Sequence, residues 1–447
     1  MAKVDDYQLF KFDEAQRKDR VERFIKTLKT TADAGIFKLP VELYMDYCAK
    51  CGTCANLCQI YLTDPKDAYH PAKKAAMLKS VYKRHFTLPG KIFGKLVGAE
   101  DLTEDKIDYI AEAAYRCTMC RRCATNCPIG IDNMMLIRTM RTVLSEGLGI
   151  EPKILTDSVK AHLKTGNASS VPDAGFKNFV QFLEGEARES SGADIKAPID
   201  KEGADYLVIP PMVDFLENAD TTIGYIKTFH AAGVDWTFSS RKFLNDSVNF
   251  GAFYNNDKLV AIMKASAEEV VKLGAKTVVI AECGHALKVW KLLMEPLIGK
   301  VPFQVKSILE VTADFIKKGK ITVDPDKNPE STTYHDPCNV ARMSGIFDEP
   351  RVIMKAICKD FREMAPNREM NYCCGGGGAV VIIDQLEDFR MNITGKYKVD
   401  QIKESGAKVV AAPCANCKKQ IRELIDHYKL DVRLAGVHDL VGNAIVF

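Results

Sequence analysis

The second half of the chain alternates short apolar runs with longer segments of helical periodicity. Apolar runs at 206–209, 277–280 and 408–411 have the length and composition of buried parallel strands. Helical patterns at 262–273 and 399–405 come directly before the second and third of these runs. This order of helices and strands predicts an open α/β layer structure in the C-terminal part of the chain.

The same half contains an internal repeat. Residues 268–283 parallel residues 399–414, and both stretches contain Gly-Ala-Lys followed by Val-Val. Earlier in each copy, Phe238-Ser239-Ser240 stands where the other has Tyr372-Cys373-Cys374. We therefore predict a tandem duplication, with one copy at 205–325 and the other at 331–447.

The N-terminal part has a helical pattern instead. A charged stretch carries an apolar stripe at helical spacing, formed by Val21, Phe24, Ile25 and Leu28. We expect a helical arm over 1–40, packed on its own domain or docked on a partner subunit. Ser, Gly and Asp cluster within 148–204, which is predicted to be a linker with short helices.

Composition excludes several classes of protein. The chain has 62 basic and 59 acidic residues, and this balance gives no case for a nucleic-acid partner. The N-terminus lacks the apolar region of a secretory signal, and no apolar run approaches the ~20 residues of a membrane span. We expect a cytoplasmic chain that reaches a membrane only through partners.

Fifteen cysteines are the strongest chemical signal, and most fall in tight clusters. Two runs have the spacing C-x2-C-x2-C-x3-C, which is the ferredoxin signature of a [4Fe–4S] cluster. In two-cluster proteins the fourth cysteine of each run binds the other cube. The predicted ligands are therefore Cys48, Cys51, Cys54 and Cys127 for cluster 1, and Cys117, Cys120, Cys123 and Cys58 for cluster 2.

Zinc is the alternative for these two runs, but zinc sites usually take their ligands as two pairs. The runs are separated by 58 residues of mostly helical, lysine-rich sequence, within a domain predicted at 41–147. The charges of Lys73, Lys74, Lys79, Lys83 and Arg84 fit a solvated helical face. A docking patch for an acidic partner or for the membrane surface is the alternative.

A third cysteine set lies in the second copy of the repeat: Cys338, Cys373, Cys374, Cys414 and Cys417. Adjacent cysteines cannot both bind one iron without strain, but they can serve two irons of a larger cluster. The glycines at 375–378 allow close backbone approach to a bulky cofactor or a thiol substrate. A phosphate-binding loop is the alternative, although the Gly-Lys-Ser/Thr sequence is missing.

The three cysteine sets in this order resemble the D-type proteins of the heterodisulfide reductases, which fuse a ferredoxin domain to CCG domains. Related iron–sulfur proteins occur in the Dsr, Hmc and Tmc transmembrane redox complexes. The resemblance implies an α + α/β fold class, with an α-helical two-cluster ferredoxin domain followed by tandem α/β CCG domains. It also implies a noncubane [4Fe–4S] cluster that cleaves a disulfide in the second CCG domain.

The first copy has lost most of these cysteines. Met212, Ser239, Ser240 and Ala286 stand at the aligned positions, and only Cys283 remains. One active CCG site is therefore expected. Cys283 and His285 would face the second-copy cluster, with His285 moving protons during thiol–disulfide chemistry, or they are buried structural residues.

We predict an oxidoreductase that passes electrons through the ferredoxin clusters to the CCG cluster for thiol/disulfide chemistry. By resemblance, its partners are a membrane cytochrome b-type subunit or another iron–sulfur subunit, together with a thiol or disulfide substrate. The chain would lie at the cytoplasmic face of the inner membrane. The alternatives are a non-catalytic electron relay and an accessory subunit of an organic-acid or glycerol-phosphate dehydrogenase.

Overall fold

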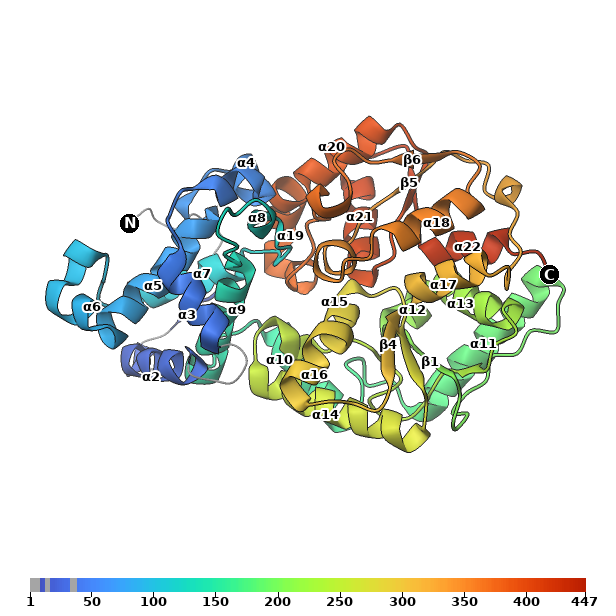
Figure 1. Cartoon of the computed structure of the whole chain (residues 1–447), viewed down its shortest axis with the longest axis horizontal. Coiled ribbons are helices and arrows are strands. Elements are labelled where there is room, and N and C mark those ends of the chain that lie inside the picture. The colour runs from blue at the N-terminus through green and yellow to red at the C-terminus, as the bar shows by residue number, and fades with distance from the viewer. Residues whose placement is uncertain (1–8, 13–16, 33–37) are drawn as a thin grey trace. The chain divides into compact units, whose positions relative to one another are not determined.

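The computed structural model describes residues 9–12, 17–32 and 38–447 (Figure 1). The chain forms two compact units, and neither is continuous in sequence. The first unit contains the chain up to Thr156, together with Ala252–Asn256 and Gly375–Tyr397. The second contains Asp157–Gly251, Asp257–Cys374 and Lys398–Phe447. Parts of the predicted N-terminal arm (1–8, 13–16 and 33–37) lie outside the described residues.

The first unit is helical. Its α-helices are α2 (Arg20–Ala32), α3 (Lys38–Tyr47), α4 (Gln59–Thr63), α5 (Pro71–Phe86), α6 (Leu88–Phe93), α7 (Glu104–Tyr115), α8 (Arg122–Thr125) and α9 (Asn133–Leu148). Short 3-10 helices join them: η2 (Thr53–Leu57), η3 (Asp67–Tyr69) and η4 (Gly94–Val97). The stripe of α2 packs on the core of this unit, because Phe24 and Leu28 are fully buried beside residues of α9.

A late segment of the chain also belongs to this helical unit. It contains η10 (Val380–Ile382), η11 (Asp384–Leu386), α19 (Glu387–Phe389) and η12 (Arg390–Thr394). The Gln59 side-chain amide donates to the Thr394 carbonyl oxygen at 2.5 Å, and the rings of Tyr69 and Phe389 lie 5.5 Å apart. Gln59, which stands where ferredoxin runs usually have proline, therefore anchors this segment.

The second unit contains two four-stranded, fully parallel sheets. The strands are β1 (Tyr206–Ile209), β2 (Trp236–Thr237), β3 (Thr277–Ile280), β4 (Gln304–Ser307), β5 (Thr332–Tyr334), β6 (Phe361–Glu363), β7 (Val409–Ala411) and β8 (Arg433–Ala435). The strand orders are β2-β1-β3-β4 and β6-β5-β7-β8, so the two sheets share one topology. The central pairs are in register, with Leu207 opposite Val278 and Thr333 opposite Val410. The predicted α + α/β fold class is confirmed.

Helices flank each sheet (Figure 1). They are α12 (Met212–Leu216), α13 (Ala219–Ala231), α14 (Asn256–Leu273), α15 (Gly284–Leu287), α16 (Met294–Ile298), α17 (Ile308–Lys317), α18 (Asp348–Ile357), α20 (Lys396–Ser405), α21 (Ala415–His427) and α22 (Val437–Ala444). Three π-helical turns are η6 (Lys288–Leu293), η8 (Asn339–Met343) and η12, and 3-10 turns are η5 (Phe250–Phe253), η7 (Pro325–Lys327) and η9 (Arg368–Met370).

Helices α13 and α22 join the two copies at a close crossing. A Cβ atom added at Gly224 would lie 1.9 Å from the His438 carbonyl oxygen, and one at Gly442 would lie 2.8 Å from the Gly224 Cα. Glycine is required at both positions, because any side chain would force the helices apart. The two copies are therefore held together by direct backbone packing.

The region predicted as a linker with short helices contains α10 (Lys153–Thr165) and α11 (Asp173–Ser191), of 13 and 19 residues. Helix α11 buries Phe176, Val180, Leu183 and Ala187, which share one face at helical spacing. This stripe packs toward α13, so α11 is part of the second unit. Among the described helices, none is both long and apolar enough to cross a membrane.

Candidate metal centres

The structure brings the eight ferredoxin-type cysteines into two groups of four. Burial raises the pKa of the Cys54 thiol, and the Cys48, Cys127 and Cys51 thiols add to this rise. Burial raises the pKa of Cys58 to about 11, and the neighbouring Cys120 and Cys117 thiols contribute. Burial likewise raises the pKa of Cys123, with contributions from Cys58, Cys120 and Cys117. These groupings are those of the exchanged-ligand arrangement.

Four of the thiols line one cavity of the helical unit. Its walls include Cys58, Cys117, Cys120 and Cys123, together with Ile60, Met134 and Ile137. Four thiols around an apolar hollow suit an iron–sulfur cube, whose ligands are thiolates and whose potential depends on burial. The residues present therefore fit the predicted cluster.

Lys74 was expected on a solvated face, but it is only 3% exposed. Its ammonium donates to the Arg116 carbonyl oxygen at 2.8 Å. Burial lowers the pKa of Lys74, and the adjacent Cys117 and Cys58 thiols oppose that effect. The reason for the difference is a tertiary contact, since α5 turns this residue toward the cysteines. Lys74 places a positive charge beside a site whose ligands are anionic.

The glycines after Cys374 contact the backbone of the second ferredoxin run. A Cβ atom at Gly377 would lie 2.4 Å from the Thr118 carbonyl oxygen, and one at Gly378 would lie 2.6 Å from the Cys117 carbonyl oxygen. Arg141 completes this contact, because its guanidinium donates to the carbonyl oxygens of Gly378 at 2.7 Å and Cys117 at 2.9 Å. Close packing between backbones therefore explains at least these two glycines.

The five cysteines of the predicted CCG site are buried in the second unit. Cys414 and Cys417 follow β7, and Cys338 follows β5, so they share the carboxyl edge of the sheet. The His335 ring nitrogen and the Cys374 and Cys417 thiols lie within 4.8 Å of one another. Two of the five predicted cysteines therefore lie together here, with His335, which is not among the predicted ligands, beside them.

The thiols of this site interact directly. Hydrogen bonds with Cys374 and Cys414 raise the pKa of Cys417 well above its ordinary value. The hydrogen bond from Cys417 lowers the pKa of Cys414 to about 7, and backbone amides, including that of Gly284, contribute. Cys414 is therefore prepared to act as a thiolate, the form that binds metal.

Polar residues of the second copy hold this site in place. Asp336 accepts two hydrogen bonds from the Arg351 guanidinium, at 2.5 and 2.7 Å, and a third from the Arg368 amide. Asn371 donates to the Asp336 carbonyl oxygen and lies 3.4 Å from the His335 Nδ1 atom. Asp336 thus supports the loop before Cys338.

Lys398 of α20 is fully buried next to the cysteines. Its ammonium donates to the Asn371 side chain at 3.0 Å and to Gln401. Burial lowers the pKa of Lys398 to about 7, while the Cys374, Cys373 and Cys417 thiols and Asp336 counteract part of that effect. No pattern in the sequence indicates this lysine, because its contacts are long-range.

The aligned positions of the first copy have different partners. The Ser239 and Ser240 hydroxyls donate to the Asp200 carboxylate at 2.8 and 2.6 Å. Met212 is buried and its amide donates to Asp246. These side chains are used in ordinary hydrogen bonding and packing, so the first copy offers no five-cysteine site.

Cys283 and His285 of the first copy are buried beside the second copy. The Ala415 amide donates to the Glu282 carbonyl oxygen at 2.8 Å, which places Cys283 next to Cys414. Burial, followed by the Cys414 thiol, raises the pKa of Cys283 well above its ordinary value. The His285 Nε2 atom lies 2.9 Å from the Asn249 carbonyl oxygen.

A buried charge network crosses between the two copies. Lys418 of the second copy lies 2.8 Å from Asp214 and 3.5 Å from Glu282, both of the first copy. The His438 Nδ1 atom lies 2.8 Å from Glu282, and the Tyr225 hydroxyl donates to Asp214 at 2.8 Å. Burial disfavours the Lys418 ammonium, but the two carboxylates outweigh burial and raise its pKa. Glu282 precedes Cys283 and Lys418 follows Cys417, so this network links the backbone beside these two cysteines.

Two family models match this chain. A 4Fe-4S dicluster domain covers residues 44–131, and a cysteine-rich CCG domain covers residues 332–422. The chain therefore carries a 4Fe-4S dicluster domain followed by a cysteine-rich CCG domain, in the order that the resemblance implied.

Curated relatives match along almost the whole chain. Iron–sulfur subunit 2 of an Hdr-like menaquinol oxidoreductase from Archaeoglobus fulgidus is 30% identical over 95% of this chain and 83% of its own length. The D subunit of a dihydromethanophenazine:CoB–CoM heterodisulfide reductase from Methanosarcina barkeri is 25% identical over 90% of this chain and 94% of its own length. An EtfAB:quinone oxidoreductase from Syntrophomonas wolfei is 23% identical over 85% of this chain and 55% of its own length.

Proposed function

Because the chain belongs to the family of Hdr-like menaquinol oxidoreductase iron–sulfur subunits, we propose that its second CCG copy reduces or forms a disulfide with electrons carried by its ferredoxin clusters. The observation that carries this proposal is the grouping of His335 with the Cys374 and Cys417 thiols. A pure relay would need only the eight ferredoxin-type cysteines.

The reaction is RS–SR′ + 2e⁻ + 2H⁺ → RSH + R′SH, or its reverse. The S–S bond breaks, both sulfurs are reduced, and each thiol gains one proton. The electrons come from, or go to, a redox partner that exchanges them one at a time. When bound, the iron–sulfur clusters supply one-electron transfer, and the cluster at the CCG site supplies a place for a substrate sulfur.

We assign eight residues to two cubane clusters and five to the CCG cluster. Cluster 1 takes Cys48, Cys51, Cys54 and Cys127, and cluster 2 takes Cys58, Cys117, Cys120 and Cys123. The CCG cluster, which we propose is noncubane, takes Cys338, Cys373, Cys374, Cys414 and Cys417. The groupings of neighbouring thiols and the depressed pKa of Cys414 support this assignment.

We propose that Cys283 and His285 line the same site from the first copy. The position of Cys283 beside Cys414 supports this role. His285 follows Cys283 by two residues, and the Asn249 carbonyl oxygen fixes its ring. Replacing His285 with Gln should slow disulfide reduction and flatten its pH profile, whereas an unchanged profile would leave His285 a structural residue.

The partners follow from the same proposal. A membrane cytochrome b-type subunit or another iron–sulfur subunit would exchange electrons with the ferredoxin clusters, at the cytoplasmic face of the inner membrane. The names of the relatives, which are subunits of a menaquinol oxidoreductase and of a dihydromethanophenazine-linked reductase, support a membrane-linked electron partner. The substrate would be a small-molecule or small-protein disulfide.

The deciding experiment is iron and sulfide analysis with EPR on anaerobically purified protein, before and after addition of a thiol. Three clusters predict about twelve irons per chain, and an oxidised-state signal that changes with thiol. The reduced protein should also be oxidised when a disulfide is added. About eight irons with no response to thiol or disulfide would instead identify an electron relay.

A further inference from the structure

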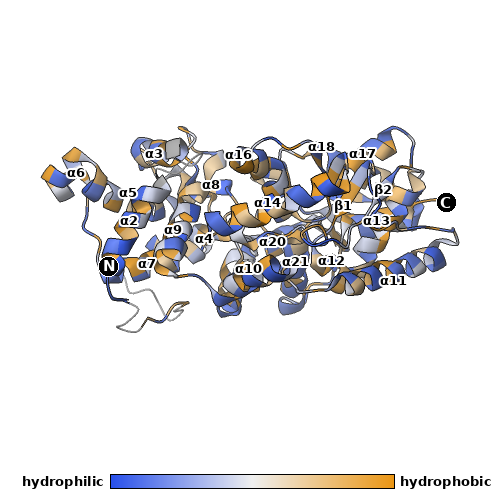
Figure 2. Ribbon diagram, turned by 90° about the horizontal axis from the view of Figure 1, so that it is seen from below, coloured by the Kyte–Doolittle hydropathy of each residue, from blue (hydrophilic) through white to orange (hydrophobic). Residues whose placement is uncertain are grey.

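The helical unit ends in an exposed apolar tip formed by α6 and η4 (Figure 1). Four large side chains there stand in solvent: Leu88 is 70% exposed, Ile92 64%, Phe93 54% and Leu96 90%. Figure 2 shows hydrophobic residues along α6 at the end of this unit. Exposed apolar groups of this density on a short hairpin mark a surface that is covered in use.

The tip and the end of α5 before it carry only basic charge. Residues 81–99 contain no Asp or Glu, but they include Lys83, Lys91 and Lys95, as well as Arg84, which pairs with Asp101 at 2.6 Å. Gly94 and Gly98 have φ values of 51° and 73° and end α6 and η4, a conformation that glycine adopts without strain. Apolar residues therefore alternate in the sequence with lysines, whose long apolar stems allow the ammonium to stay in a polar layer.

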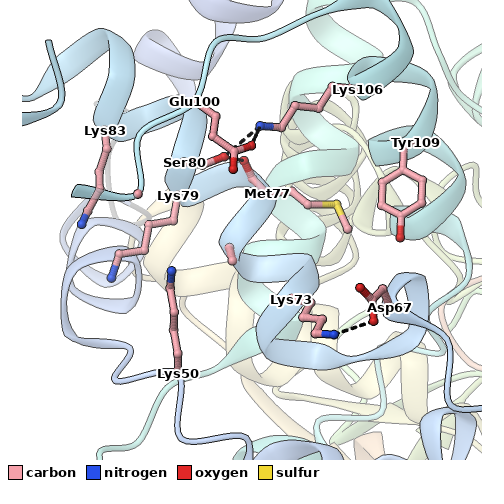
Figure 3. A pocket seen from close by; sticks show the side chains of 12 residues that line it. Lys50, Asp67, Lys73, Met77, Lys79, Ser80, Lys83, Glu100, Lys106 and Tyr109 are labelled. Carbon is pink, nitrogen blue, oxygen red and sulfur yellow. Dashed lines mark hydrogen bonds and ion pairs between the residues drawn. The ribbon is translucent and has the colours of Figure 1, made fainter. Parts of the chain in front are cut away.

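A hollow of about 330 Å³ lies directly beside the tip (Figure 3). Its lining includes Lys50, Lys79, Lys83 and Gly98, and the Lys50 ammonium lies against Gly98. Lys79 donates to the Asp46 carbonyl oxygen at 3.1 Å and Lys83 to the Val97 carbonyl oxygen at 3.2 Å. Within the described ranges, none of these three ammonium groups is paired with a carboxylate.

Two other lysines of the hollow form ion pairs with carboxylates, unlike Lys50, Lys79 and Lys83. Lys106 pairs with Glu100 at 2.6 Å and Lys73 pairs with Asp67 at 2.5 Å, as Figure 3 shows. Burial, then the charge of Lys83, lowers the pKa of Lys79. Three like charges held around one hollow repel each other, and a bound anion would relieve that repulsion.

We propose that the α6–η4 tip is a membrane-binding surface, in which Leu88, Ile92, Phe93 and Leu96 enter the acyl-chain boundary of an anionic bilayer. Lys50, Lys79 and Lys83 then hold lipid phosphates in the adjacent hollow. Apolar groups that insert shallowly, surrounded by lysines that hold headgroups, are the combination that binds a bilayer surface. A membrane-surface patch is the sequence-based alternative for Lys79 and Lys83, and this proposal replaces the expectation that the chain reaches a membrane only through partners.

A bilayer fits this surface better than an acidic protein does. An acidic partner would account for the lysines, but it would not explain why four large apolar side chains are exposed beside them. Lys50 lies between Cys48 and Cys51, so binding here would bring the loop of proposed cluster 1 to the membrane surface. Electrons could then enter from a membrane-bound donor at this loop.

The test is sedimentation of the full-length, cluster-loaded protein with vesicles of phosphatidylcholine, with and without phosphatidylglycerol. We expect binding only to the anionic vesicles, weakened as salt rises. Ile92→Ser with Leu96→Ser, and separately Lys79→Glu with Lys83→Glu, should each weaken binding at least tenfold. Phe182→Ser, an exposed aromatic (63%) of α11, and Lys264→Glu, at an exposed position of α14, are matched controls that should bind normally.

A reporter variant tests insertion directly. Leu96→Trp should show a blue-shifted emission on anionic vesicles and quenching by lipids brominated on the acyl chain. Absence of vesicle binding by the unmodified protein, equal losses in tip and control variants, or binding without a shift at position 96 would each overturn the proposal. So would binding that requires vesicles bearing a membrane protein partner. None of these readouts depends on disulfide chemistry, so this inference and the proposed function fail separately.

Discussion

The two sheets of the second unit share one strand order but differ in the chemistry at their carboxyl edges. In the second copy that edge holds Cys374, Cys417 and His335 within 4.8 Å of one another. In the first copy Ser239 and Ser240 bind the Asp200 carboxylate instead. The same topology therefore supports a candidate metal site in one copy and an ordinary polar cluster in the other.

The first copy nevertheless packs against the candidate site of the second. It supplies the acidic members of the buried network, Asp214 and Glu282, and the second copy supplies Lys418 and His438. It also places Cys283 beside Cys414. The difference teaches that two sheets of one topology can carry different chemistry at their edges and still share one buried charge network.

The largest effect is expected from removing a thiol of the second copy. Cys417→Ser should lose about four irons per chain together with disulfide-dependent oxidation, because Cys417 contacts both Cys374 and Cys414. Cys283→Ser, at an equally buried first-copy position, should keep its iron. Iron analysis and EPR measure both. Equal iron loss in Cys283→Ser would mean that the two copies share one cluster.

The second-largest effect is expected on stability, from breaking the buried charge network between the copies. Lys418→Met leaves Asp214 and Glu282 as uncompensated buried carboxylates and should lower the free energy of unfolding by about 3–5 kcal/mol. Lys419→Met removes a partly exposed ion pair with Glu423 on the same helix, and the expected loss is under about 1 kcal/mol. Denaturant titration compares the two. Similar losses would show that the copies are not held together by this network.

A buried histidine beside the first copy gives a pH test of moderate size. His162 stacks on Phe243, and burial lowers its pKa to about 4. The unfolded chain takes up this proton near its ordinary pKa of about 6.5, so stability is complete above that pH and is lost as pH falls toward 4. His162→Phe should remove on the order of 2 kcal/mol of this loss between pH 6.5 and 5.

Acid unfolding midpoints measure this difference. His427→Phe, at an exposed histidine that ends α21, is the control and should leave the acid midpoint unchanged. A midpoint in His162→Phe that matches the unmodified protein would mean that His162 is protonated in the folded state, contrary to its burial.

The smallest effect is expected on a reduction potential. At a pH below its pKa of about 7, where the Lys398 ammonium is mostly protonated, Lys398→Met removes a buried positive charge near Cys374, Cys373 and Cys417. Its loss should make the potential of the CCG cluster more negative by on the order of 50–100 mV, for a unit charge at an effective dielectric constant of about 20. Lys403→Met, on the exposed side of α20, should change it little. Redox titration followed by EPR distinguishes the two, and an equal shift would exclude a specific role for Lys398.

The sequence predicts the parts of this molecule that depend on local spacing. The runs containing Cys48 and Cys117 specify ligands by residue number, because neighbouring thiolates must point at one centre. The apolar runs that became β1, β3 and β7 are short and bounded by helices, so their strand character can be inferred without tertiary information.

The rest depends on contacts between distant residues. Lys74 belongs to a lysine-rich run that predicts solvent exposure, yet the fold turns it toward Cys58 and Cys117. His335 is separated by 39 and 82 positions from Cys374 and Cys417, and Lys398 meets the same cysteines from another helix. Such contacts cannot be predicted from periodicity or composition, because they join residues that are far apart in the sequence.

The helical unit includes residues 375–397, which begin directly after Cys374. A ribosome must therefore synthesise residue 397 before that unit can be completed, long after its eight N-terminal cysteines have emerged. A gene encoding this chain also cannot be divided at one interdomain linker without removing part of the helical unit. Fusion and fission of the two cofactor modules in evolution would thus require this returning segment to be carried with the CCG module.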